Sequence, residues 1–397
     1  MDFDFTDSQQ QFRQEIRTWL EKNVPEELRG RGFASSRGEP EAVARLRAWQ
    51  RTLHKAGYVG MDWPPEYGGR GASLVEQVML YEEMARAQAP QPLNRSGLSM
   101  LGPTLMKHGT AAQKGRHLDK ILTAEEIWCQ GFSEPNAGSD LANLQTRAVL
   151  DGDWYVLNGQ KVWTSLAHVA DMGFFLVRTD PTVAKHKGIT FILIDMKTPG
   201  ITVRPLRQIT GEAEFNEVFL DNVRVSAANV VGKVNEGWGV AITTLAYERD
   251  VLTMIRHISL RTALERLIAL ARRTRRNGRT AAEEPVIRQK IAALVVAERC
   301  IQLNGYRSLT KILRGDTPGP EGSTSKLFWS QVDQDLAEVA TEVLGPYSQV
   351  AAGSDWAADE GQWAFYACLA RGSGIRAGTS EILRNILGER VLGLPKD

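Results

Sequence analysis

Glu248 is the residue whose type and setting best suit acid–base chemistry, because it lies within an apolar run with helical spacing. On a helix it would share a face with five apolar residues and one threonine: Ala241, Thr244, Leu245, Val251, Leu252 and Ile255. Burial of an ionised carboxylate is costly and raises its pKa, which suits a general base that removes a weakly acidic proton from carbon. The alternative interpretations are a structural ion pair with Arg249 and a helix face that is solvated at one end.

The composition does not indicate a metal site, a disulfide framework or a nucleic-acid partner. The six histidines are isolated and lack metal-ligand spacing, so we predict no metal site. The three cysteines, Cys129, Cys300 and Cys368, form no CxxC pair or disulfide framework, which is typical of a reducing compartment. With 48 Lys and Arg against 47 Asp and Glu, the net charge of +1 argues against a nucleic-acid partner.

Targeting segments are not indicated either. No apolar run reaches the roughly 18 residues that a membrane-spanning helix needs. The first residues, MDFDFTDSQQQ, are acidic and have neither the apolar core of a signal peptide nor the basic bias of a transit peptide. We therefore expect a cytoplasmic protein with no membrane partner.

The elements that must position Glu248 follow three successive patterns. Apolar spacing is helical from residue 5 to about 125, beginning with a capping box at Thr6 and Gln9 and continuing at 41–56 and 74–86. From about Trp128, short β-prone runs are typical of a small sandwich or barrel: 154–163, 174–177, 190–194, 201–204 and 218–225. Asn158-Gly159 divides the first of these runs and predicts a hairpin turn. From Gly237 the helical period returns.

The domain organisation follows from these patterns. A chain of 397 residues suggests two or three domains at about 150 residues each. The patterns favour three: a helical domain at 1–125, a β domain at 126–235 and a helical bundle at 236–397. No alternating βαβ rhythm is present, and the glycine cluster at 68–71 follows no strand, which argues against a Rossmann domain.

Four motifs lie in order along nearly the whole chain: EYGGRG at 66–71, WCQGFSEPNAGSD at 128–140, LNGQKVWTS at 157–165 and GTSEILRNILGERVLGLP at 378–395. Together they resemble the signatures of the acyl-CoA dehydrogenase family. The resemblance implies an α+β multidomain fold with an N-terminal helical domain, a central β-barrel and a C-terminal four-helix bundle. It also implies FAD held non-covalently between barrel and bundle, in a homotetramer (a dimer of dimers) or a hetero-oligomer.

The implied reaction is oxidation of an acyl-CoA thioester to the trans-2-enoyl-CoA, as in fatty-acid β-oxidation, with an electron-transferring flavoprotein as acceptor. A carboxylate takes the α-proton while the β-hydrogen leaves as hydride to flavin N5. The resemblance assigns cofactor contacts to Gln130, Phe132, Ser133, Trp163, Thr164, Ser165, Gly378, Thr379 and Glu381. It assigns substrate contacts to Ser139, Arg249 and Ala377.

These assignments are chemically coherent. Hydrogen-bond donors along the flavin edge stabilise its anionic reduced form, and a helix that begins after Gly378-Thr379 presents free N–H groups to a pyrophosphate. Each residue alone has a structural alternative: Trp163 as a cross-strand aromatic, and Ser133 or Ser139 as a turn hydroxyl.

Two departures from the family pattern concern the site. Many members have the catalytic Glu at the position of Ala377, whereas the branch that includes isovaleryl- and long-chain acyl-CoA dehydrogenases has it on the first long bundle helix, where Glu248 falls. The backbone N–H of Ala377 can still polarise the thioester carbonyl. The usual Arg-x-x-Phe-Gly is replaced by an arginine-rich run at 271–279, which could contact FAD or CoA phosphates or form a solvated helix end.

Two further segments leave alternatives open. Residues 342–346 match the usual Gln-x-x-Gly-Gly only loosely. Arg376 stands where the family often has an apolar or tyrosine side chain, which favours either a carboxylated acyl group or a surface arginine. The same scaffold could also serve a flavin oxidase, an N-hydroxylase, a desulfinase or a non-catalytic partner subunit.

Overall fold

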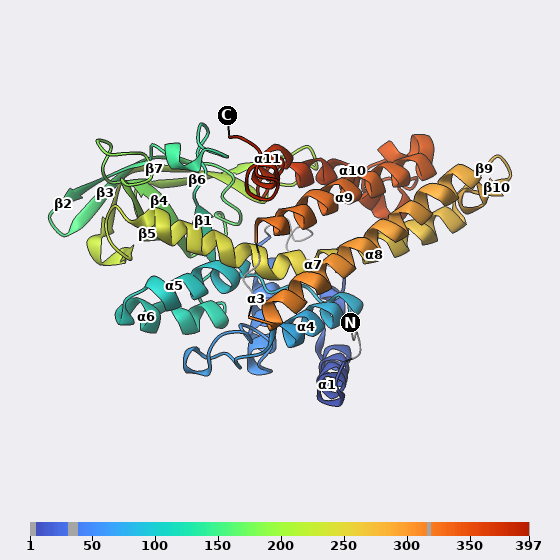
Figure 1. Ribbon diagram of the computed structural model, residues 1–397, viewed down its shortest axis with the longest axis horizontal. Coiled ribbons are helices and arrows are strands. Elements are labelled where there is room, and N and C mark those ends of the chain that lie inside the picture. Colours follow the sequence, from blue (N-terminus) through green and yellow to red (C-terminus); the bar gives the residue numbers. More distant parts are fainter. Residues whose placement is uncertain (1–4, 31–38, 316–318, 397) are drawn as a thin grey trace. The chain divides into compact units, whose positions relative to one another are not determined.

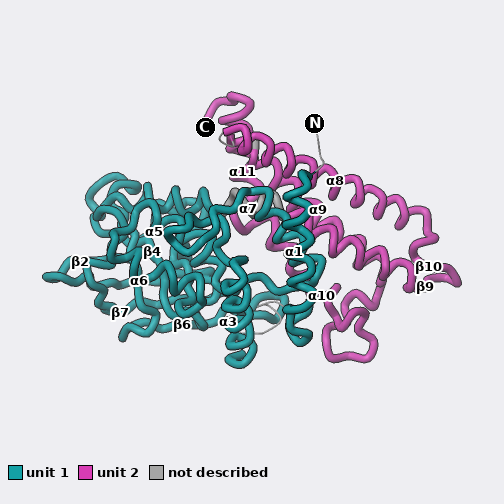
Figure 2. Tube along the Cα trace, turned by 90° about the horizontal axis from the view of Figure 1, so that it is seen from below, with its two compact units in different colours: residues 1–250 teal, residues 251–397 magenta. Residues whose placement is uncertain are grey.

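The computed structural model describes residues 5–30, 39–315 and 319–396, except for the side chains of residues 248–255 and 321. It contains two compact units, residues 1–250 and 251–397 (Figure 2). The predicted domain boundaries at residues 125 and 235 stay predictions. No helix in the described part of the chain is long and apolar enough to cross a membrane.

Three helices of unit 1 lie where the sequence predicts them. Helix α1 (Asp7–Asn23) has the predicted capping box, in which Thr6 accepts from Gln9 N and the Gln9 side chain accepts from Thr6 N. The predicted helices at 41–56 and 74–86 are confirmed as α3 (Pro40–Lys55) and α4 (Leu74–Arg86). Helices α5 (Gly102–His108) and α6 (Ala111–Leu122) complete the set.

The β region forms one eight-stranded sheet (Figure 1). Its strands are β1 (Trp128–Gly131), β2 (Arg147–Asp151), β3 (Trp154–Lys161), β4 (Met172–Arg178), β5 (Ile189–Asp195), β6 (Ile201–Leu206), β7 (Phe215–Ser226) and β8 (Val230–Val231). Their order is β6–β7–β3–β2–β4–β5–β8, and β1 pairs in parallel with β4.

The predicted central barrel was wrong, because this sheet is open. Among the described strands, β6 pairs only with β7 and β8 only with β5, so the two ends do not join. Closure requires each edge strand to find a partner. Pro205 in β6 has no N–H to donate, which is typical of an edge strand, and β8 is only two residues long.

Strand β4 lies at the centre of unit 1, because both of its faces are buried. Phe174 and Leu176 belong to the core that the sheet shares with the N-terminal helices. Phe175 and Val177 point to the opposite face, into a core made largely by β3, β5 and β7. The sheet therefore fixes the backbone of β1, which pairs with β4 along its whole length.

The predicted hairpin turn at Asn158-Gly159 was also wrong. Strand β3 runs straight through this dipeptide, and its register against β7 shifts between Leu157 and Gly159, as in a β-bulge. The turn that joins β2 to β3 is Gly152-Asp153, where Gly152 has φ +58°. Gly159 is needed for close approach, since a Cβ there would lie 2.7 Å from Thr146 Cα.

Unit 2 is helical apart from one small hairpin. Helix α7 (Gly237–Arg273) runs through the division between the units. It is followed by α8 (Pro285–Leu313), α9 (Ser323–Leu344), α10 (Gln362–Arg371) and α11 (Ser380–Arg390). The core of this unit includes Leu267 of α7, Ile301 of α8, Leu336 and Val343 of α9, and Trp363 of α10.

The arginine-rich run contains a hairpin that the sequence interpretation missed. Strands β9 (Arg275–Arg276) and β10 (Arg279–Thr280) flank Asn277-Gly278, whose φ values of +49° and +83° suit a two-residue turn. Arg273 pairs with Asp359, and Arg276 Nη1 donates to the Glu342 carbonyl at 2.7 Å. Two of these arginines, Arg273 and Arg276, thus have partners elsewhere in unit 2, and a contact of the run with FAD or CoA phosphates stays a prediction.

We predict that Gly159→Ala lowers the free energy of unfolding by about 1–3 kcal/mol, because the new Cβ would meet the Thr146 backbone. Gly115→Ala on the exposed face of α6 is the matched control. Its Cβ would meet no atom within 4 Å, so this helical position should gain up to about 1 kcal/mol. Urea denaturation of both variants checks the prediction, and equal stability of the two would contradict the close approach.

Candidate functional site

Strand β1 leads into the first predicted cofactor segment. Phe132 follows β1 directly and packs edge-on against Phe174 and Phe191, with ring centroids 5.8 and 5.9 Å away. Ser133 is half-buried, and its carbonyl accepts a hydrogen bond from Val162 N at 2.9 Å. This bond joins the first segment to the residues that follow β3. Two stretches about thirty residues apart in sequence thus become one surface.

A buried ion pair fixes the same junction. Lys161 is the last residue of β3, and its Nζ lies 2.8 Å from Glu134 Oε1. The ammonium also donates to the carbonyl of Phe132 at 3.2 Å. The side chain of Lys161 is 0% exposed, so its ammonium group is shielded from water and faces the Glu134 carboxylate.

Glu134 is held from a third direction. Its two carboxylate oxygens accept from the backbone N–H groups of Gln145 at 2.6 Å and Thr146 at 2.8 Å. Burial alone would raise the pKa of Glu134, but the Lys161 charge and these hydrogen bonds outweigh it and hold that pKa below its usual value. Burial lowers the pKa of Lys161 to about 8, and the charge and hydrogen bond of Glu134 oppose this shift.

The second predicted segment, Trp163 to Ser165, turns sharply after β3. Trp163 has φ +58°, a left-handed conformation that is uncommon for an aromatic residue. The start of β7 holds this turn in place. Thr164 N donates to the Asn216 carbonyl at 3.0 Å, and Asn216 Nδ2 donates back to the Thr164 carbonyl at 2.9 Å. The Asn216 side chain is itself fully buried.

This turn presents groups that suit a flat aromatic cofactor. The Trp163 indole is 57% exposed although it lies edge-on against Phe215. The neighbouring Thr164 is 0% exposed, and no described residue hydrogen-bonds its buried Oγ1. An unpaired buried hydroxyl is costly and therefore points to a bonding partner outside the protein chain. Ser165 follows and is half-buried.

The remaining predicted residues of unit 1 differ in accessibility. Gln130, on β1, is half-buried. Ser139 is exposed in the loop after the first segment, next to Asp140, whose carboxylate pairs with Lys185 at 2.8 Å. Glu248 and Arg249 lie on α7, as the spacing predicts, but their side chains are outside the described residues.

In unit 2 the predicted residues form one corner before α11. Ala377 and Gly378 have φ values of +56° and +93°. Thr379 is the N-cap of α11, and its hydroxyl accepts from Ile382 N at 3.2 Å. Glu381 is exposed in the first turn, and backbone and Thr379 hydrogen bonds hold its pKa below the usual value. The predicted helix start after Gly378-Thr379 is therefore confirmed.

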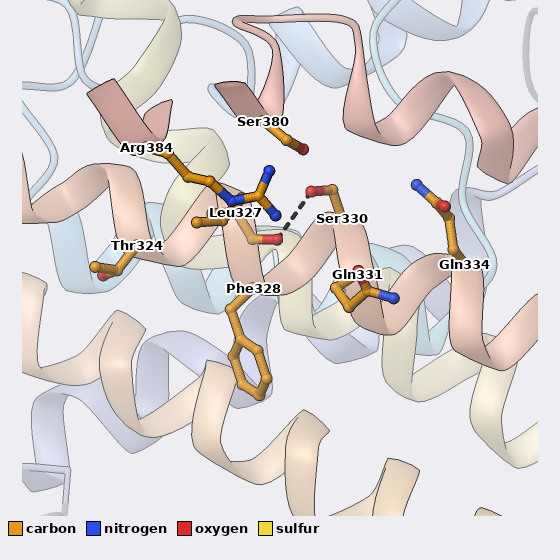
Figure 3. Close-up of a pocket in the computed structure, with 8 residues that line it drawn as sticks. All are labelled: Thr324, Leu327, Phe328, Ser330, Gln331, Gln334, Ser380 and Arg384. Atoms are coloured by element: carbon orange, nitrogen blue, oxygen red, sulfur yellow. Dashed lines mark hydrogen bonds between the residues drawn. The ribbon is translucent and has the colours of Figure 1, made fainter. Parts of the chain in front are cut away.

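Unit 2 also has a cavity of about 350 Å3 between α9 and α11 (Figure 3). Its lining residues are Thr324, Leu327, Phe328, Ser330, Gln331, Gln334, Ser380 and Arg384. None of them was among the predicted site residues, although Ser380 directly follows Thr379. Arg376 is exposed and donates weakly to Ser373 Oγ at 3.4 Å.

Two residues that matter to the geometry, Lys161 and Glu134, were quoted within the motifs but not selected from the sequence. Period-two alternation along β3 does place Lys161 on the same face as the buried Tyr155 and Leu157. A lysine on a buried face needs an anionic or carbonyl partner. That signal was present in the sequence, whereas the identity of the partner was not.

Comparison with known proteins supports the same motifs. Family models for the acyl-CoA dehydrogenase N-terminal, middle and C-terminal domains match residues 6–125, 129–223 and 235–392. The chain belongs to the acyl-CoA dehydrogenase family. Acyl-CoA dehydrogenases are FAD flavoproteins, so this one is an FAD-dependent oxidoreductase. The exposed Trp163 and the unpaired Thr164 hydroxyl fit such a cofactor.

Several relatives resemble this acyl-CoA dehydrogenase over most or all of its length. Acyl-CoA dehydrogenase IpdE1 of Mycobacterium tuberculosis is 41% identical over 395 residues, 98% of each chain. Acyl-CoA dehydrogenase FadE34 of the same organism is 42% identical over 350 residues, 87% of this chain and 46% of that protein. Among solved structures, the Tcur3481-Tcur3483 steroid ACAD covers 100% of both chains at 30% identity, with a TM-score of 0.87. The ChsE4-ChsE5 complex from M. tuberculosis reaches 0.86 at 29% identity, also over 100% of both chains.

We predict that Lys161→Met lowers the free energy of unfolding by about 3–5 kcal/mol, because it leaves the Glu134 carboxylate buried without its counter-charge. The double variant Glu134→Gln/Lys161→Met should recover part of that loss, since no uncompensated charge remains. Lys185→Met is the control: its pair with Asp140 has the same 2.8 Å distance but is exposed, so its loss should stay below about 1 kcal/mol. Equal losses in the two single variants, measured by urea denaturation, would contradict the role of burial.

We predict that Thr164→Val weakens FAD binding about tenfold while the apoprotein keeps or gains stability, because the buried hydroxyl bonds none of the residues that the structure describes. FAD titration of the apoprotein, followed by flavin fluorescence, measures the affinity. Thr190→Val is the control, since that buried hydroxyl bonds Thr179 at 2.7 Å and Asn235 N at 2.9 Å. It should lower stability and leave FAD affinity unchanged; the reverse pattern would refute the assignment.

Proposed function

We propose that this acyl-CoA dehydrogenase oxidises an acyl-CoA thioester to the trans-2-enoyl-CoA. The observation that carries the proposal is the joined surface of residues 133 and 162–165, with its exposed indole and its unpartnered buried hydroxyl. A dehydrogenation at saturated carbon needs a hydride acceptor, a base and an electrophilic group at the thioester carbonyl. FAD would be the hydride acceptor, and the chain offers candidate residues for the other two roles.

The residues proposed to hold FAD are those that the sequence motifs assign. Gln130, Phe132, Ser133, Trp163, Thr164 and Ser165 would contact the flavin ring, with Ser165 near N5. Gly378, Thr379 and Glu381 would lie at the pyrophosphate, where free N–H groups at the start of α11 favour negative charge. When bound, FAD supplies the acceptor for the hydride that leaves the β-carbon of the substrate.

Glu248 is the proposed catalytic base. Its position on α7, within an otherwise apolar helical stripe, would disfavour the ionised form and so raise its affinity for the substrate α-proton. Arg249 would lie toward the substrate, and Ser139 would face the CoA portion. Ala377 has no carboxylate in its side chain, so it is not the base. Its backbone N–H would donate a hydrogen bond to the thioester carbonyl oxygen.

For the acyl group we propose a bulky, steroid-type ring system rather than a linear fatty acyl chain. The support is the 30% identity over the full chain to a solved protein named as a steroid ACAD. That structure and the ChsE4-ChsE5 complex both carry two protein names, which supports assembly of this chain with a second related subunit. An electron-transferring flavoprotein is the proposed electron acceptor.

We predict that Glu248→Gln abolishes anaerobic bleaching of the flavin by an acyl-CoA while FAD stays bound, because the amide is unable to accept the α-proton. Absorbance near the flavin maximum follows the bleaching, and a substrate series of linear, branched, aromatic, dicarboxylic and steroid-derived acyl-CoAs identifies the acyl class. Glu265→Gln, at an exposed position on the same helix, is the control and should bleach normally. Undiminished bleaching by the Glu248 variant would refute the base assignment, and rapid oxygen consumption during turnover would favour an oxidase.

A further inference from the structure

Helix α9 carries charged side chains on a buried stripe. Lys326, Ser330, Asp333 and Ala337 recur at steps of four, three and four residues and so share one face of the helix. Lys326 is 5% exposed and Asp333 is 7% exposed. A cation and an anion in such positions are costly unless each finds close polar partners.

The partners of Asp333 come from α10 and from the turn that follows it. Tyr366 OH donates to Oδ1 at 2.5 Å, and Ser373 Oγ donates to Oδ2 at 2.5 Å. Burial, together with the Asp333 charge, raises the pKa of Tyr366, so the phenol remains a neutral donor. Ser373 is fully buried and also accepts from Arg376 Nη2 at 3.4 Å.

Lys326 reaches the other end of the same segment. Its Nζ donates to the carbonyl of Gly378 at 2.7 Å. Burial, followed by the charges of Arg256 and Arg376, lowers its pKa to about 8, and Glu381 opposes the shift. Lys326 forms no salt bridge with any carboxylate among the described residues, and the Gly378 carbonyl accepts the hydrogen bond of its ammonium group.

The segment between these two contacts, residues 373–378, is tightly folded and strained. Ile375 N and Arg376 N both donate to the Gly372 carbonyl at 3.0 Å. Ala377 then adopts φ +56°, which an L-residue with a Cβ rarely accepts, and Gly378 follows at +93°. Such strain persists only where surrounding contacts over-determine the backbone, and it is concentrated at functional positions.

We propose that Asp333 and Lys326 are positioning residues that clamp segment 373–378 at its two ends and so hold Ala377 in its left-handed conformation. The clamp would aim the Ala377 N–H at the thioester carbonyl oxygen, and in this respect it rests on the function proposed above. The two residues are seven positions apart, about 10 Å along one face of α9. One rigid helix thus contacts both ends of the segment.

The chemistry of the contacts favours positioning over stability alone. A buried lysine that donates to a carbonyl is an inefficient way to stabilise a fold, because well-packed apolar residues are often neutral or better in such places. A directional N–H···O bond, by contrast, fixes where the carbonyl of Gly378 points. Because the peptide units on either side of Gly378 are linked, that orientation also constrains Ala377.

The kinetic test compares Lys326→Met and Asp333→Asn with Glu338→Gln in the full-length, FAD-loaded enzyme. Glu338 is the matched control, because it is a carboxylate on the same helix that pairs with Arg371 at 3.1 Å but is 57% exposed. A displacement of about 1 Å at a reacting centre costs about 100-fold in rate. We expect kcat to fall by about that factor in both clamp variants with KM changed less than threefold, and to stay within twofold in the control.

Hydrogen–deuterium exchange of the same variants supplies a readout that needs no turnover. Amides of residues 373–379 should exchange faster in both clamp variants, while those of α9 and α10 keep the protection they have in the wild type. Exchange that is unchanged in the segment, or that rises across the whole of unit 2, would overturn the clamp. Should Lys326→Met fail to fold, Ser373→Ala removes one end of the clamp without touching a charge, and the same pattern is expected of it.

The two experiments separate failure of the clamp from failure of the proposed function. A wild-type enzyme that oxidises none of the acyl-CoA series would overturn the dehydrogenase proposal, and the exchange pattern would still decide the clamp. Faster local exchange with unchanged kcat would overturn the positioning role. Loss of kcat with faster local exchange and a thermal midpoint near the wild-type value would support it.

Discussion

The ion pair between Lys161 and Glu134 is the constraint on which the geometry around Ser133 and Trp163 depends. It ties the end of β3 to the loop after β1, and Glu134 extends the tie to the backbone before β2. Both partners are removed from water, so their attraction is little screened and their geometry is well defined. Without it, the hydrogen bonds from Val162 N to the Ser133 carbonyl and from Lys161 Nζ to the Phe132 carbonyl would still join the two stretches, but the Glu134 carboxylate would be left buried without its counter-charge.

The same device occurs in unit 2. There, too, a buried lysine donates to a main-chain carbonyl of a predicted cofactor or substrate segment: Lys161 to Phe132, and Lys326 to Gly378. A long side chain with a charged tip can reach a loop from the rigid element that carries it, a strand in one case and a helix in the other. Loops that must present backbone groups to a ligand are thereby held by ordered secondary structure.

Local sequence patterns predicted much of the framework. Capping residues marked helix starts at Thr6 and Thr379, and β-prone runs located β4, β5, β6 and β7. Prediction from local patterns was wrong where the same residue pair can occur in two different structures. Asn158-Gly159 suits a tight turn, but here its glycine allows the close approach of Thr146 within a continuous strand, while Asn277-Gly278 does form a turn. The prediction of a closed barrel was wrong for a related reason. Pairing between strands that are distant in sequence leaves no local signature in the residues.

The sequence by itself determined the family, the order of helical and β segments and the motifs that contain the proposed cofactor residues. Each of these rests on residue type and spacing, which act over a few positions along the chain. Only the tertiary structure decided that Lys161 meets Glu134, that Thr164 is left with an unpartnered hydroxyl, and that Asp333 and Lys326 contact the two ends of one strained segment. Those contacts join residues from 27 to 52 positions apart, and burial, which gives their charges and hydrogen bonds their strength, exists only once the whole chain has folded.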